Sequence, residues 1–356
     1  MYIPKYTITT SILRQIGQVE AAREVIENAP LVPDWEARFQ DDARARVVHF
    51  GTALEGNDLT FSQTKSVLEG NGEDIVARER DIQEVINYRK VLEYIEKLAD
   101  RKSDIVYTRE ILLDLHGLIT DKIIEADQTG FRETQVVLKN SITGEVGFRP
   151  PSFLEVPFLV DDFLRWINSD YGRKEHPVLR AGITHYILAA IHSFIEGNGR
   201  TARALATLVL FSEGYDIRRL FALEEYFDRH ADEYFGSLME VSNQARRLED
   251  RDLTPWLDTF TKALAVELSK VKDKVRELSV DIKIREKHGK QIGLSARQMT
   301  LVEYLNAHGE VTMGVARELL SMVSEDTILR DLKYLLDNEV VVKKGSTKGA
   351  RYVLKK

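Results

Sequence analysis

The chain has 356 residues, of which 43% are hydrophobic and 30% charged, and its formal net charge is -7 at pH 7. This length predicts two or three domains, and no apolar run approaches the ~18 residues of a membrane-spanning helix. The absence of cysteine excludes a disulfide framework and thiolate chemistry. Because the amino-terminal residues also lack the regions of a secretory signal, we expect a cytoplasmic protein with no membrane partner.

Helical periodicity covers most of the chain, so we expect a mainly α fold. Asp34 is a candidate N-cap for an amphipathic helix that is expected to end at Gly56-Asn57. Residues 82–98 and 108–119 repeat the helical spacing of apolar side chains. These segments predict an amino-terminal helical region.

A short β segment interrupts the helices between residues 131 and 153. β-Branched residues flank Asn140-Ser141 and Thr143-Gly144, and Pro150-Pro151 follows. This pattern predicts a hairpin or a pair of short strands and then a proline stop. Helices resume afterwards, and the one that begins at His176-Pro177 is apolar on nearly all sides, which predicts a position at the centre of the core.

A long amphipathic helix is expected from Thr254-Pro255 to about Glu286. The polar, glycine-containing segment 285–293 is a predicted linker. Three helical patterns and two final strands follow, with Ser324 as the N-cap of the third helix. The end of the chain therefore has an organisation of its own.

That carboxyl-terminal pattern resembles a winged helix-turn-helix domain, with residues 343–351 as the wing. From Lys343 to the end there are six Lys or Arg residues and no acidic residue, a basic patch that suits contacts with DNA phosphates. The helix in the recognition position is less favourable, because Glu325, Asp326 and Asp331 would repel DNA. DNA binding through residues 294–356 and contact with a protein both stay open, since a fold alone does not decide function.

The segment IHSFIEGNGRTAR, residues 191–203, carries the strongest functional signal. His192 ends a buried helix, and an imidazole with pKa near ~6.5 can accept a hydroxyl proton at neutral pH. Gly197 and Gly199 permit backbone conformations with positive φ, which lets several N–H groups converge on one point. The turn therefore combines a candidate base with a candidate anion site.

The residues around that turn extend the same chemistry to polyphosphate. Arg200 begins the next helix, whose amino terminus favours an anion, and Arg203 lies on the same helical face. Glu196 could hold Mg²⁺ against phosphate oxygens. Together these groups favour nucleotidyl or phosphoryl transfer. The alternative is a glycine-capped helix connection with a core histidine and two solvated arginines; a Walker loop fits less well because its lysine and glycine spacing are absent.

These residues resemble the signature of the Fic family, His-x-Phe-x-Asp/Glu-Gly-Asn-Gly-Arg-x-x-Arg. The matching positions are His192, Phe194, Glu196, Gly197, Asn198, Gly199, Arg200 and Arg203. Ser193 stands where the family usually has proline, a position that shapes the turn and not the chemistry. The resemblance implies a Fic-type helical bundle with a small β-hairpin flap and, beyond it, the winged helix-turn-helix domain. It spans roughly residues 34–267.

Carried over to these positions, the resemblance implies that AMP moves from ATP to a protein hydroxyl. His192 would deprotonate the target Ser, Thr or Tyr, and Glu196 would position Mg²⁺ on the α- and β-phosphates. Phe194 would anchor the turn. The implied ATP and phosphate contacts are Gly197, Asn198, Gly199, Arg200, Thr201 and Arg203, the Asn198 side chain and the backbone N–H groups of 197–200 stabilising developing charge.

The resemblance also implies a flap that docks the target. Residues 130–132 and the strand of Val136, Val137, Leu138 and Lys139 match its position, and this strand would hold a target segment by β-augmentation. Tyr234 falls where the family places an aromatic of the adenine pocket. A core tyrosine is the alternative at that position.

Upstream, GTALEGN at residues 51–57 resembles the family's inhibitory motif, Ser/Thr-x-x-x-Glu-Gly/Asn. The resemblance implies that Glu55 pairs with Arg203 and occupies the place of the γ-phosphate. Gly51 stands at the Ser/Thr position and Thr52 comes one place late, so the hydroxyl contact is either shifted or absent. A polar helix end is the alternative interpretation of Glu55 and its neighbours.

Several functions therefore stay open. The first is a protein adenylyltransferase inhibited by Glu55, and AMP removal or transfer of phosphate or phosphocholine are variants of it. The second is a nucleotide-sensing transcriptional regulator, which would need the phosphate-binding turn but no base at His192. The resemblance implies a homodimer, with an unidentified target protein. The expected divisions are residues 1–107 with the inhibitory motif, 108–253 as the Fic catalytic core, 254–293 as long helix and linker, and 294–356 as the winged helix.

Overall fold

The computed structural model describes residues 1–31, 33–72, 75–100, 105–125, 128–139, 146–287, 294–321, 323–345 and 350–355. These residues form two compact units, Met1–Val280 (unit 1) and Asp281–Lys356 (unit 2). Within the described ranges, no helix combines the length and apolarity needed to cross a membrane. The finer divisions expected at residues 107 and 253 stay predictions.

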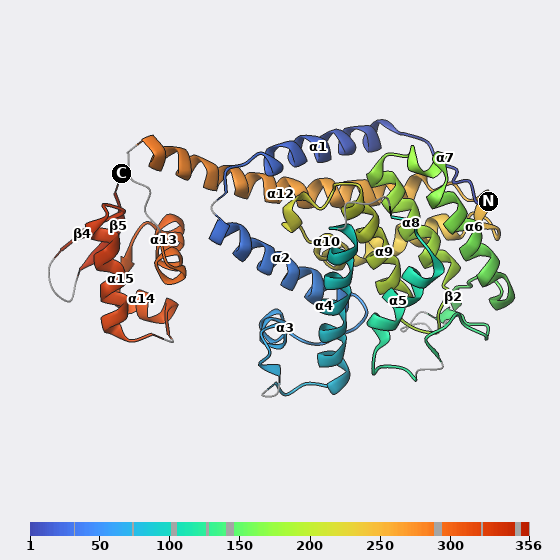
Figure 1. The fold of residues 1–356 in the computed structure, drawn as a ribbon, viewed down its shortest axis with the longest axis horizontal. Helices are drawn as coiled ribbons and strands as arrows, with labels where there is room; N and C mark the ends of the chain where they lie inside the picture. Colours follow the sequence, from blue (N-terminus) through green and yellow to red (C-terminus); the bar gives the residue numbers. More distant parts are fainter. Residues whose placement is uncertain are drawn as a thin grey trace. The chain divides into compact units, whose positions relative to one another are not determined.

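Unit 1 is mainly helical (Figure 1). Its helices are α1 (Thr10–Glu27), α2 (Pro33–Ala53), α3 (Phe61–Leu68), α4 (Glu79–Ala99), α5 (Arg109–Thr120), α6 (Val156–Asn168), α7 (Asp170–Arg173), α8 (Pro177–Ile191), α9 (Asn198–Ser212), α10 (Leu223–Arg229), α11 (Ala231–Ser242) and most of α12 (Thr254–Lys287), whose last residues, 281–287, belong to unit 2. Short 3₁₀ turns lie at η3 (Phe153–Glu155), η4 (Ile217–Arg219) and η5 (Leu248–Asp250). α1 runs alongside α12 (Figure 1), where the Thr261 hydroxyl hydrogen-bonds to Gln15.

The helix α8 lies at the centre of unit 1, as its apolar sequence predicts. Nearly all its side chains are buried, and α9 packs beside it. A Cβ at Gly182 would lie 2.9 Å from Leu257 Cδ2, so the glycine lets α12 approach closely. The Trp256 indole N–H donates to the Gly182 carbonyl at 2.7 Å. The end of α8 is thus held within a packed core.

Two helix starts illustrate local sequence rules. Thr108 caps α5, its hydroxyl accepting the Ile111 N–H at 3.3 Å, as the periodicity from Thr108 suggests. The expected cap at Asp34 is wrong, because α2 begins at Pro33 and Asp34 lies within its first turn. Proline fits the first helical position, where its missing N–H costs no hydrogen bond.

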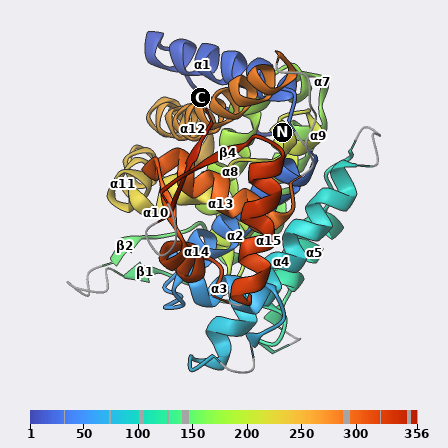
Figure 2. The same ribbon diagram turned by 90° about the vertical axis from the view of Figure 1, so that its left-hand side faces the viewer.

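The β segment of unit 1 consists of β1 (Leu138–Lys139) and β2 (Val146–Phe148), which lie side by side as an antiparallel pair (Figure 2). Residues 140–145, including the expected turns at Asn140-Ser141 and Thr143-Gly144, lie outside the described residues. The expected linker 285–293 is partly helical, since α12 continues to Lys287. Its remaining residues, 288–293, are likewise outside the description.

Unit 2 has its own core and contains α13 (Ala296–His308), β3 (Val311–Thr312), α14 (Met313–Leu319), α15 (Glu325–Asp337), β4 (Val341–Lys344) and β5 (Arg351–Leu354). The strands form an antiparallel sheet in the order β3-β5-β4. β3 is too short to have a sequence pattern of its own. Residues 346–349 of the expected wing lie outside the described residues.

Candidate active site in unit 1

The segment between α8 and α9 forms a tight, buried turn. His192 ends α8 in the left-handed region, with φ 54° and ψ 59°, and its backbone N–H donates to the Leu188 carbonyl at 3.0 Å. The Phe194 ring is 2% exposed and stacks on His116, with ring centroids 3.7 Å apart. Phe194 therefore anchors the turn in the core.

Side chains within the turn hold its backbone in place. The Asn198 side-chain oxygen accepts the Phe194 N–H at 2.9 Å, and its amide donates to the Phe194 carbonyl at 2.8 Å. The Thr201 hydroxyl donates to the Gly197 carbonyl at 2.8 Å. Gly197 has φ 76°, a conformation that favours glycine. The Asn198 and Thr201 side chains thus shape the turn, while the N–H groups of the first turn of α9 lack partners within the helix.

His192 is partly buried and lies beside the β segment. Its Nδ1 is 3.3 Å from the Ala189 carbonyl oxygen, and the Phe148 ring of β2 lies edge-on at 6.2 Å. Burial lowers the pKa of His192 to about 4; Arg132 lowers it too, whereas the Ala189 contact and Glu55 raise it. The imidazole is therefore neutral at pH 7. With Nδ1–H donated to Ala189, Nε2 carries the lone pair of a base.

Arg132 fixes the loop of His192 to the base of the β segment. Its Nε donates to the His192 carbonyl at 2.8 Å, and Nη2 donates to the Pro151 carbonyl at 2.6 Å. The Arg132 backbone N–H donates to the Ser193 carbonyl at 2.9 Å. Burial lowers the pKa of Arg132. Each of these bonds ends on a backbone carbonyl, so Arg132 orders two loops at once.

Arg203 lies in α9 and is 2% exposed. Its Nη2 is 2.9 Å from Glu55 Oε1 and donates to the Gly51 carbonyl at 2.9 Å. Burial lowers the pKa of Arg203, but Glu55 and Tyr234 outweigh it and the pKa is raised. A Cβ at Gly199 would lie 2.3 Å from Glu55 Oε1. The Glu55 carboxylate therefore occupies the anion-favouring first turn of α9.

The structure also explains the glycine at position 51. A Cβ there would lie 2.6 Å from Cε1 of Tyr88, whose hydroxyl donates to Glu224 at 3.2 Å. The Thr52 hydroxyl donates to the Val48 and His49 carbonyls, at 2.9 and 3.0 Å. Thr52 is thus engaged within its own helix.

Arg200, the other arginine of the turn, meets a group of residues that the sequence did not indicate. Arg200 is 3% exposed, and its Nη1 lies 3.3 Å from Glu84 Oε1 on α4. Glu84 also accepts from Arg80 Nε at 3.3 Å and from Asn57 Nδ2 at 3.0 Å. Arg80 further pairs with Glu196. The one signal in the sequence was the i, i+4 spacing of Arg80 and Glu84, which places both side chains on one face of a helix. No local pattern linked them to Asn57 or Arg200.

Comparisons with known proteins agree with this geometry. Residues 106–210 match the model of the Fic/DOC family. The matched segment includes the turn from His192 to Arg203. Glu55 and α4 lie outside the matched residues. The chain is also 31% identical over 182 residues to Protein adenylyltransferase Fic of Drosophila sechellia, an alignment that covers 50% of this chain and 34% of that protein. The chain thus spans about a third of the length of this curated relative.

Solved structures share the fold. A Fic family protein from Desulfovibrio desulfuricans G20 is 24% identical, with a TM-score of 0.65 covering 99% of this chain and 98% of that one. A Fic domain containing signaling protein from Bacteroides thetaiotaomicron VPI-5482 is also 24% identical, with a TM-score of 0.62 covering 75% of this chain and 97% of that one. The first likeness extends over both units of the chain.

The β segment of unit 1 has exposed apolar side chains in and just before β1. Val137 is 41% exposed and Leu138 is 40% exposed, while Val136 is partly buried. Lys139 lies in β1 beside them. The strand expected at 136–139 is thus limited to its last two residues, and Leu138 pairs with Phe148 of β2, whose ring lies near His192.

Tyr234 lies in the core, the second of the two positions that the sequence allowed. It is 3% exposed, and its hydroxyl is 3.1 Å from His185 Nε2 and accepts from Arg203 Nη1 at 3.4 Å. Its ring packs on Phe227, with centroids 4.6 Å apart. Tyr234 therefore holds Arg203 through its hydroxyl, and its buried ring is not accessible for stacking against an adenine.

The residues present can accommodate a magnesium ion in one way. Among the described residues no group of three or more His, Asp or Glu side chains forms a protein-only metal site. Magnesium, however, is often bound by one or two carboxylates together with substrate phosphates. Glu196, whose side chain is 31% exposed beside the first turn of α9, supplies one such carboxylate. The donor set therefore fits a metal brought in with a nucleotide.

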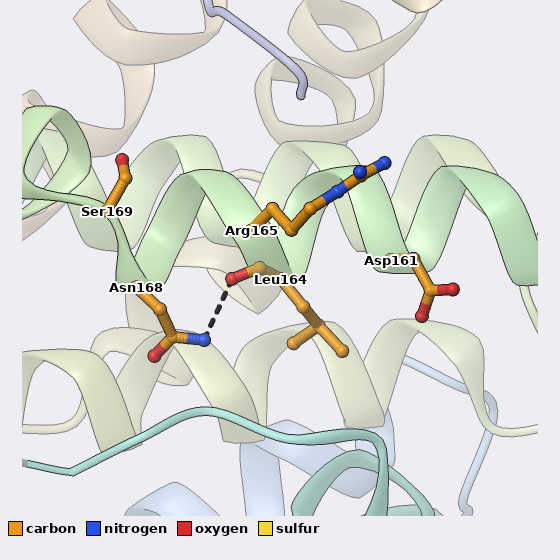
Figure 3. Close-up of a pocket in the computed structure, with 5 residues that line it drawn as sticks. All are labelled: Asp161, Leu164, Arg165, Asn168 and Ser169. Carbon is orange, nitrogen blue, oxygen red and sulfur yellow. Dashed lines mark hydrogen bonds between the residues drawn. The ribbon is translucent and has the colours of Figure 1, made fainter.

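A surface hollow on α6 is not a second site. It is lined by Asp161, Leu164, Arg165, Asn168 and Ser169 (Figure 3). Asn168 Nδ2 donates to the Leu164 carbonyl at 2.8 Å (Figure 3), while Asp161 pairs with Arg109 and Arg165 with Asp162. These polar side chains are thus engaged by neighbouring residues, and the Ser169 hydroxyl donates to the Trp166 carbonyl rather than to a base.

Proposed function

We propose that this chain is a protein adenylyltransferase, which transfers AMP from ATP to a Ser, Thr or Tyr hydroxyl of a target protein, and that Glu55 inhibits it. The observation that carries the proposal is the turn from His192 to Arg203. This turn brings together the neutral imidazole of His192, the amino terminus of α9 and the two buried arginines Arg200 and Arg203. A Fic domain and a curated relative named as an adenylyltransferase support the same activity.

The proposed reaction uses the residues of the turn in distinct roles. His192 Nε2 takes the proton of the target hydroxyl, whose oxygen bonds to the α-phosphorus as the bond to the bridging oxygen of pyrophosphate breaks. Backbone N–H groups at the start of α9 stabilise the charge that develops on the α-phosphate. Arg200 and Arg203 hold the β- and γ-phosphates. Mg²⁺ held by Glu196 would neutralise charge on the α- and β-phosphates.

The ion pair between Glu55 and Arg203 supports inhibition. Arg203 cannot bind a phosphate while its Nη2 is 2.9 Å from the Glu55 carboxylate. The carboxylate also lies over Gly199, where an anion would enter. Displacing Glu55 therefore frees a buried cation and the first turn of α9 together. A glutamate so placed could instead orient water for removal of AMP, and this reverse reaction is the second candidate.

The position of the label in ATP tests the transfer. With Mg²⁺ and the Glu55→Gly variant, ATP labelled on the α-phosphate should leave label on protein, and ATP labelled on the γ-phosphate should not. The reverse pattern would indicate transfer of phosphate. If a protein that already carries AMP loses it, and the loss requires Glu55, the reverse reaction would be favoured instead.

The pH dependence should report the environment of His192. Because its pKa is lowered to about 4, the base is unprotonated throughout the range from pH 7.5 to 5.5. We expect kcat/KM to fall less than about twofold over that range, whereas a pKa of ~6.5 would cause a roughly tenfold fall. The measurement uses Glu55→Gly with Mg²⁺-saturated ATP, with nucleotide binding followed in parallel. An inflection near pH 6.5 in rate but not in binding would contradict this.

We propose a second role, DNA binding, for unit 2, as a winged helix. Of the three acidic residues expected to repel DNA, Asp331 and Glu325 form ion pairs, whereas Asp326 is exposed. Asp331 is 5% exposed and accepts from Arg297 Nε at 2.8 Å, and Glu325 pairs with Arg317. The outer face of α15 instead carries the exposed cations Arg330 and Lys333. The exposed lysines Lys343 and Lys344 of β4 add to this positive surface.

A salt titration of the full chain tests this role. The logarithm of the DNA affinity should fall linearly with the logarithm of the salt concentration. Arg330→Ala/Lys333→Ala should reduce the slope by about 2, since each phosphate contact contributes about 0.9. Lys97→Ala/Lys174→Ala removes the same charge from exposed sites on unit 1 and should change little. Absence of salt-dependent affinity would favour protein contact.

A further inference from the structure

The helix α4 presents a polar row to α9 that includes Arg80 and Glu84, one helical turn apart. Glu84 is 4% exposed, and its Oε1 contacts both Arg80 Nε and Arg200 Nη1 at 3.3 Å. Its Oε2 accepts from Asn57 Nδ2 at 3.0 Å. One buried carboxylate therefore orients two guanidinium groups and neutralises only one of their charges.

The two arginines converge on a single oxygen. Arg80 Nη2 pairs with Glu196 Oε1, and Arg200 Nη2 lies 3.7 Å from the same atom. Arg200 is 3% exposed, yet its Nε has no hydrogen-bond partner, and the 3.3 Å contact of its Nη1 with Glu84 is an ion pair without hydrogen-bond geometry. Buried donors without partners are costly, and an anion is the ligand that satisfies a guanidinium. A phosphate bound by Arg200 would thus lie close to Arg80.

We propose that Arg80 is a third phosphate-binding arginine for the polyphosphate of ATP, supplied by α4 and held in position by Glu84. The inference rests on the proposed function, because it takes a nucleotide as the ligand of the turn. When Glu196 turns to the metal, Arg80 Nη2 transfers from that carboxylate to a phosphate oxygen. Arg80 is 51% exposed at its side chain, so this movement meets no packed core. Arg80 is then a ligand contact, and Glu84 is a positioning residue.

Calorimetric binding of the α,β-methylene analogue of ATP with Mg²⁺ tests the proposal on the full chain in the Glu55→Gly background. Arg80→Gln should weaken binding about tenfold, the loss of one charge-assisted bond. Arg80→Lys keeps the charge and should restore part of that loss, which a merely structural role would not predict. Arg89→Gln is the matched control, an arginine of α4 that pairs with Glu93 and should leave binding unchanged.

Unchanged affinity in Arg80→Gln would overturn the proposal. Tighter binding would overturn it too, because it would mean that Arg80 only competes with the metal for Glu196. If the Glu55→Gly parent binds the analogue and Arg80→Gln leaves the affinity unchanged, this inference fails and the proposed function stands. If the folded parent does not bind the analogue at all, both fail.

Discussion

Replacing Glu55 with glycine should raise self-modification by roughly ten- to a hundredfold over the wild type. The carboxylate forms an ion pair with the buried Arg203 and lies against Gly199. A charge-assisted hydrogen bond contributes about 1.5–3 kcal/mol, and the nucleotide must displace it before Arg203 can bind a phosphate. Glycine is tolerated locally, because position 55 lies in the turn after α2. The rate is measured as labelled AMP incorporated per unit time.

Two variants separate this effect from a general loosening of the turn. Glu55→Gln keeps the shape and one hydrogen bond but removes the charge, so its rate should fall between the wild type and Glu55→Gly. Glu69→Gly changes an exposed glutamate at the end of α3 and should behave as the wild type. Equal rates for the wild type and Glu55→Gly, with ATP binding intact, would remove Glu55 as an inhibitor.

The His192→Ala variant should lose about 10²–10⁴-fold in rate, the usual contribution of a general base. The loss should fall on kcat, because in the proposed reaction His192 acts on the hydroxyl, whereas Arg200, Arg203 and the start of α9 hold the phosphates. Affinity for the ATP analogue should therefore stay within about twofold of the parent. The experiment uses the Glu55→Gly background, where the basal rate is measurable.

His116→Gln is a useful comparison for that variant. His116 is fully buried and stacks on Phe194, and its ring nitrogens lie 2.9 and 3.0 Å from the Thr129 and Glu196 carbonyl oxygens, so it supports the turn from within the core. We expect it to lower the melting temperature and to affect binding and rate together. If His192→Ala instead weakened binding as much as it lowered the rate, His192 would be a structural residue of the turn.

The sequence was most informative where function depends on neighbours along the chain. The residues from His192 to Arg203 are contiguous, so their spacing alone placed a histidine, two glycines and two arginines in one turn. The apolar sequence of α8 likewise predicted its central position. The pairing of Glu55 with Arg203 came only through the family resemblance, because no local pattern joins positions so far apart.

Other features depended on tertiary packing that single-sequence patterns do not contain. Tyr234 could have faced an adenine or the core, and its hydrogen bonds to His185 and Arg203 place it in the core. Position 51 needs glycine because Tyr88 of another helix fills the space beside it. The role of Glu84 depends on where α4 packs against α9. In each case the residue type was visible, but its partner was not.

Adenylyl transfer and its inhibition are best tested together by labelling with ATP that carries the label on its α-phosphate, in the presence of Mg²⁺. The proteins are the wild type, Glu55→Gly and the double variant Glu55→Gly/His192→Ala. We expect strong label on Glu55→Gly, weak label on the wild type and none on the double variant. Equal label on the two variants would contradict His192 as the base, and no label on any of them, with ATP bound, would contradict adenylyl transfer itself.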